Sequence, residues 1–87
     1  MNTEQSIKKE TEKWLLKIRA EIKGVKPSGK KGEEFLENIQ AYIEDSGYFM
    51  EKGDLVRSFE AVIWAWAILE TTKELGLLKT QKPNKGN

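Results

Sequence analysis

The sequence predicts an all-α fold, a three-helix bundle built on a tight antiparallel αα-hairpin. Three segments carry apolar residues at helical spacing, at about residues 3–23, 33–52 and 55–75. A glycine follows each segment, and only two residues separate the last two segments. Because no stretch shows the strict alternation of a half-buried strand, we expect no β-sheet.

The first segment predicts a helix with a single buried stripe. That stripe has Thr11 in its gap and otherwise consists of Ile7, Trp14, Leu15, Ile18 and Ile22. Residues 24–32 then hold three glycines, one proline and several lysines. Glycine and proline are poor helix formers, so this stretch is expected to be a flexible basic connector.

The second and third segments predict the hairpin. Ser46 and Gly47 lie near the centre of the apolar face of the second helix, where small residues let another backbone approach closely. Gly53 is suited to end that helix in a left-handed conformation. Asp54 follows it and is suited to cap the third helix, which ends at Gly76. The short connection places the two helices side by side and antiparallel.

Glu70 is the acidic residue that breaks the predicted pattern of the third helix. At about 100° per residue it projects to the same side as Leu55, Phe59, Ile63 and Trp66. Burial of an unpaired carboxylate is costly, so Glu70 is expected to be paired, protonated or at an opening. A pairing with a lysine is one interpretation. A half-exposed position where the helices splay apart is a second interpretation. A third is a small-ligand or hard-cation site that combines Glu70 with Asp45, Tyr42 and Ser46.

Trp64 belongs to a second apolar stripe on the other side of the third helix. The stripe also contains Ala61, Ile68 and Leu75. An all-round apolar helix in a small domain needs cover on both sides. Either the first helix, with Trp14 and Ile18, or a second copy of the chain is expected to cover this stripe.

The charges are segregated although the net charge is only +1. Residues 1–31 hold nine basic and four acidic residues, and residues 32–78 hold three basic and ten acidic residues. This distribution fits a basic helix beside an acidic one. It also allows electrostatic binding of nucleic acid, with contacts from Lys26, Lys30 and Lys31.

The composition argues against several kinds of chemistry. The chain has no Cys and no His, which removes thiolate chemistry and the most frequent general base and transition-metal ligand. Gly24, Gly29 and Lys30 match part of a phosphate-binding loop, but Lys31 stands where Ser or Thr is needed to hold magnesium. We therefore expect no catalytic residue, no metal and no cofactor.

The organisation predicted is one helical domain over residues 1–78, followed by a disordered basic tail at 79–87. No apolar run is long enough to span a membrane, and the start lacks the pattern of a signal peptide. A cytoplasmic protein without a membrane partner is expected.

Residues 33–78 resemble the archaeal domain-of-unknown-function family 357. The resemblance rests on the hairpin around Gly53 and Asp54, the aromatic and alanine segment that follows, and the closing Leu75-Gly76-Leu77-Leu78. Asp45, Trp64 and Glu70 also fall on the family pattern, although Thr71 and Thr72 stand where members often carry Ala-Gly. The resemblance implies a helical protein and supplies no activity.

The sequence favours a non-enzymatic protein–protein interaction or self-association module. Its contact surface would be the stripe around Trp64. The alternatives are a weak electrostatic nucleic-acid binder and a small-ligand or metal site near Glu70.

Overall fold

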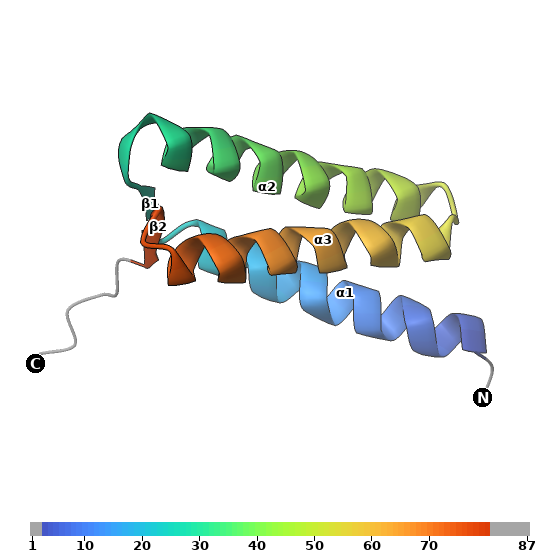
Figure 1. The fold of residues 1–87 in the computed structure, drawn as a ribbon. Helices are drawn as coiled ribbons and strands as arrows, with labels where there is room; N and C mark the ends of the chain where they lie inside the picture. Colours follow the sequence, from blue (N-terminus) through green and yellow to red (C-terminus); the bar gives the residue numbers. More distant parts are fainter. Residues whose placement is uncertain (1–2, 81–87) are drawn as a thin grey trace, which may run out of the picture.

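The computed structural model describes residues 3–80 and confirms the three-helix fold. α2 and α3 form the antiparallel hairpin, and α1 packs along one side of it (Figure 1). The elements in order are α1 (Thr3–Ile22), β1 (Val25–Pro27), α2 (Gly29–Glu51), α3 (Leu55–Glu74) and β2 (Leu78–Thr80).

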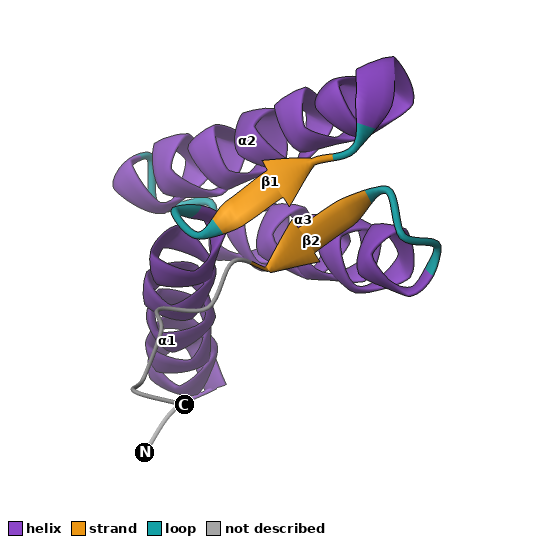
Figure 2. Cartoon of the chain, turned by 90° about the vertical axis from the view of Figure 1, so that its left-hand side faces the viewer, coloured by secondary structure: helices purple, strands orange, loops and turns teal. Residues whose placement is uncertain are grey.

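The two short strands are the main departure from the predicted architecture. β1 and β2 pair antiparallel, with Val25 opposite Thr80 and Pro27 opposite Leu78, and the sheet lies across one end of the helices (Figure 2). The expectation that the chain has no sheet is therefore wrong. Three residues are too few to show an alternating pattern, and the pairing joins distant parts of the chain, which local periodicity does not report.

The predicted connector at 24–32 is mostly regular structure. It contains β1, and α2 begins at Gly29 rather than at about residue 33. Gly32 is buried in the first turn, where a Cβ atom would lie 2.4 Å from the carbonyl oxygen of Leu77. The Ser28 N–H donates to that same oxygen at 2.8 Å. Tertiary contact thus outweighs the low helix propensity of glycine.

The predicted tail also differs at its start. Lys79 and Thr80 belong to β2, and residues 81–87 lie outside the described part of the chain.

The hairpin forms as predicted and is held by a buried pair of serines. Gly53 has a φ of +80°, and the Asp54 side chain accepts a hydrogen bond from the Arg57 N–H at 3.1 Å. Ser46 Oγ donates to the Ser58 carbonyl at 2.8 Å, and Ser58 Oγ donates to the Ser46 carbonyl at 2.7 Å. Both serines are fully buried, so their small size lets α2 and α3 approach closely.

α1 is held against α3 by a tryptophan pair. The rings of Trp14 and Trp66 meet edge to face, with centroids 5.6 Å apart. Trp66 Nε1 donates to the Trp14 carbonyl oxygen at 3.1 Å. Lys73 on α3 also forms an ion pair with Glu21 on α1. Beneath these contacts lies the shared core of all three helices, where Ile18, Ile39 and Leu69 are fully buried.

Candidate interaction surface

Glu70 is exposed, so the stripe predicted for it is not buried, and the exposed position agrees with the alternative that it lies at an opening. The same stripe leaves Phe59 and Ile63 with 37% and 41% of their surface exposed. The side of α3 that is buried consists instead of Ser58, Ala61, Val62, Ala65, Leu69 and Thr72. Because α3 is apolar on most sides, periodicity alone could not decide which side faces α2. The small residues decide it, since they permit close helix packing.

An exposed Glu70 predicts a nearly neutral response to substitution. We expect Glu70→Gln to change the free energy of unfolding by less than about 0.5 kcal/mol, as is usual for a surface position. Urea denaturation followed by circular dichroism measures this change. A loss or gain of more than about 1 kcal/mol would contradict the exposed position.

The four residues of the predicted ligand site do not converge. Tyr42 and Asp45 line one shallow hollow together with Trp64 and Glu60. Ser46 is buried and fully engaged with Ser58, so it does not face that hollow. Glu70 does not line it either. Among the described residues 3–80, no group of three or more acidic side chains is placed to hold a metal ion.

Trp64 lies on a surface that α1 does not cover. The expectation that α1 might cover it is wrong, because Trp14 of α1 contacts Trp66 instead. Trp64 keeps 58% of its surface exposed and Leu75 keeps 66%. Of the remaining members of the predicted stripe, Ile68 is half-buried and Ala61 is buried.

The exposed stripe continues across α2. We define the hairpin face as the surface of the hairpin formed by Phe35, Tyr42, Phe49, Trp64, Ile68 and Leu75. The rings of Tyr42 and Trp64 stack with centroids 6.5 Å apart. The sequence interpretation did not include Phe35 and Phe49 in this surface. Their seven-residue spacing from Tyr42, which keeps all three on one side of α2, is the signal that could have found them.

A hollow of about 210 Å³ lies on this face beside Trp64. Its lining consists of Phe35, Trp64, Ala67, Ile68, Thr71, Thr72 and Leu75. These residues carry no charge, and they come from α2, from α3 and from its C-cap residue Leu75. The hairpin face therefore combines an exposed tryptophan, stacked on Tyr42, with an adjacent apolar hollow.

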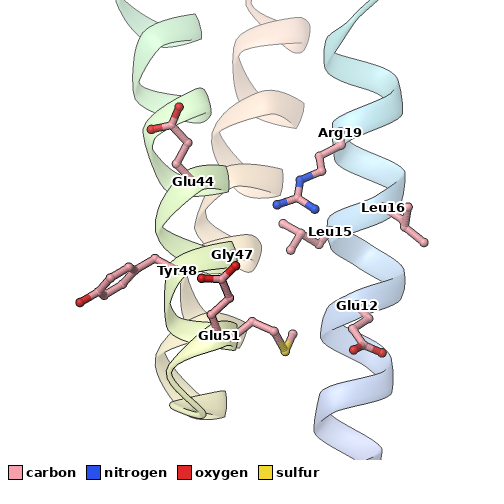
Figure 3. A pocket seen from close by; sticks show the side chains of 9 residues that line it. Glu12, Leu15, Leu16, Arg19, Glu44, Gly47, Tyr48 and Glu51 are labelled. Atoms are coloured by element: carbon pink, nitrogen blue, oxygen red, sulfur yellow. The ribbon is translucent and has the colours of Figure 1, made fainter.

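A second groove lies between α1 and α2, on another part of the surface (Figure 3). Arg19 points from α1 toward α2, and a Cβ atom at Gly47 would lie 2.9 Å from its Nη2 atom. Leu15 also points into the groove, whereas Leu16 and Tyr48 point away from it. With the acids Glu12, Glu44 and Glu51 on its lining, this groove mixes charges of both signs and holds no aligned pair suited to acid–base chemistry.

The lysines of the predicted nucleic-acid site are all exposed at the sheet end. Lys26 lies opposite Lys79 across the sheet. Lys31 forms an exposed ion pair with Glu34 at 3.8 Å. The structure brings these lysines to one end of the molecule, in β1 and in the first turn of α2.

A family model described as a protein of unknown function, DUF357, matches residues 9–78. The chain belongs to the DUF357 family. The crystal structure of protein AF1782 from Archaeoglobus fulgidus, also a DUF357 protein, is similar to it, with a TM-score of 0.85 and 48% sequence identity. That similarity covers 92% of this chain and all of the other. No curated protein matches the chain.

The DUF357 match confirms the resemblance inferred for residues 33–78 and extends it to most of α1. The family region therefore includes most of the docked first helix, the strand β1 and the first residue of β2. No helix in the described part of this DUF357 protein is long and apolar enough to cross a membrane.

Proposed function

We propose that this DUF357 protein is a non-enzymatic interaction module that associates with a second copy of itself through the hairpin face. The observation that carries the proposal is the exposure of Trp64 beside an apolar hollow on the side of the hairpin that α1 leaves open. Exposed aromatic residues next to apolar pockets are typical of the anchors that dominate protein interfaces.

A second copy is the partner that this surface fits best. The hairpin face is made by two antiparallel helices, and an identical face placed on it completes a four-helix arrangement. A two-fold axis relates the two copies in such a contact, so the same surface of each copy covers that of the other. The hollow beside Trp64 carries no charged side chain, which favours its burial.

The test is the oligomeric state of the full chain. We expect sedimentation velocity to show a monomer–dimer equilibrium between about 1 μM and about 1 mM. Trp64→Ala should weaken the dimer at least about thirtyfold, because a central aromatic anchor contributes about 2 kcal/mol or more.

The matched control for this test is Leu16→Ala. Leu16 is 70% exposed on α1, outside the hairpin face, and its substitution should leave the dimer unchanged. A wild-type chain that stays monomeric over the whole range, or equal effects of the two substitutions, would contradict the proposed function.

A further inference from the structure

The positions of α2 and α3 along their common direction show which residues of the two helices lie side by side on the hairpin face. The hydrogen bonds between Ser46 and Ser58 place these two residues at the same height in the hairpin. Because the helices are antiparallel, a step back along α2 from Ser46 corresponds to a step forward along α3 from Ser58. Ile68 therefore lies at about the level of Leu36, between the turn and the sheet.

The hollow spans this level, with Trp64 at its turn side and Thr71 and Leu75 at its sheet side. Trp64 is displaced toward the turn by about 6 Å, at ~1.5 Å of rise per residue. On the sheet side of the hollow, Thr71 lies about 5 Å and Leu75 about 10 Å from this level, at the same rise per residue. A two-fold axis that runs across the helices near Ala67 and Ile68 superimposes each Trp64 on the hollow of the other copy. Each copy thus supplies one projecting ring and one hollow.

The same axis brings opposite charges together. The two-fold axis crosses α2 near residues 36–37. Measured along the helix from that point, Lys31 lies about 8 Å toward the sheet and Asp45 lies about 13 Å toward the turn. Lys31 of one copy then lies within about 5 Å, measured along the helix, of Asp45 of the other, a gap that a lysine side chain spans. Asp45 makes no ion pair within the described residues 3–80, and the Lys31–Glu34 pair is well exposed.

We propose that two copies pair through the hairpin face in an antiparallel arrangement, with Trp64 in the partner's hollow and Lys31 beside the partner's Asp45. This inference rests on the proposed function and adds its geometry. α2 then packs on the α2 of the other copy, and α3 packs on the α3. The alternative, with the axis along the helices, packs α2 on the partner's α3 and leaves Lys31 distant from Asp45.

Charge exchange tests this pairing in the full chain by sedimentation velocity. Lys31→Glu and Asp45→Lys should each weaken the dimer about tenfold, because symmetry makes every substitution act twice. The combined variant should return to within about threefold of the wild type, since the attraction is restored with its sign reversed. If the loss of dimer affinity in the combined variant equals the product of the losses in the two single variants, the proposed arrangement is wrong.

Cross-linking gives a second test, because the chain has no cysteine of its own. Asn38 lies near the proposed axis on the exposed side of α2. Asn38→Cys should therefore give a covalent dimer in high yield with a short bismaleimide. The control Glu44→Cys, on the α1–α2 groove, should not.

The two proposals fail in different ways. If the wild type dimerises and Trp64→Ala abolishes it, while Asn38→Cys gives no cross-link and charge exchange gives no recovery, the antiparallel arrangement alone is wrong. If no dimer forms at any concentration, the proposed function is wrong as well.

Discussion

Trp66→Ala is expected to lower the free energy of unfolding by about 2–4 kcal/mol, somewhat less than for a fully buried aromatic residue, because Trp66 is half-buried against the core. The substitution removes the edge-to-face contact with Trp14 and the hydrogen bond from Nε1 to the Trp14 carbonyl. These two interactions join α1 to the hairpin, so the loss should appear as weaker docking of α1. Chemical denaturation followed by circular dichroism measures it.

Trp64→Ala is the matched control, since the same side chain is removed only two residues away. Trp64 is 58% exposed and contacts Tyr42 rather than α1. We expect a loss of about 1 kcal/mol or less, consistent with one exposed aromatic contact. Both variants are measured at a concentration where the wild type is monomeric, because dimerisation adds stability by mass action. Equal losses in the free energy of unfolding for the two variants would contradict the assignment of Trp66, and not Trp64, to the contact with α1.

Gly32→Ala is the second substitution with a large expected effect. A Cβ atom at this position would lie 2.4 Å from the Leu77 carbonyl oxygen, which belongs to the backbone and cannot rotate away. Either α2 or the connection between α3 and β2 must move. We expect the free energy of unfolding to fall by about 1–3 kcal/mol, as for other overpacked sites, and urea titration measures it.

Gly47→Ala provides the comparison within the same helix. Its Cβ atom would lie 2.9 Å from Nη2 of Arg19, the far end of a flexible side chain that can shift at little cost. The gain in helix propensity, about 1 kcal/mol, should then dominate and make this variant at least as stable as the wild type. If both substitutions change the free energy of unfolding in the same direction, contact with the Leu77 backbone is not the cause of the effect at Gly32.

Local features of the fold could be predicted because they depend on neighbouring residues. Gly53 and Asp54 end one helix and begin the next through their own backbone and side-chain preferences. Ser46 was placed on the contact side of α2 because its neighbours share that face. Both predictions are confirmed, since the serine forms hydrogen bonds with Ser58 in the hairpin core.

The candidate site could be predicted only in part. The sequence groups Trp64, Ile68 and Leu75 with Ala61, and in the structure the first three line one hollow whereas Ala61 is buried, so their role as an interface stays a prediction. Glu70 was assigned to the wrong side, because a helix that is apolar on most sides has no clear polar boundary in its sequence. Whether Trp64 or Trp66 contacts α1 depends on the docking of α1.

The sequence by itself determined the three helices, the tight hairpin and the small residues that allow close contact. The tertiary structure decided which side of α3 is buried, that Gly32 is a contact residue and that distant strands pair. It also decided that the Trp64 surface stays open. The physical reason is that helix ends and periodicity follow from interactions between neighbours, whereas burial follows from competition among several apolar surfaces for a single small core.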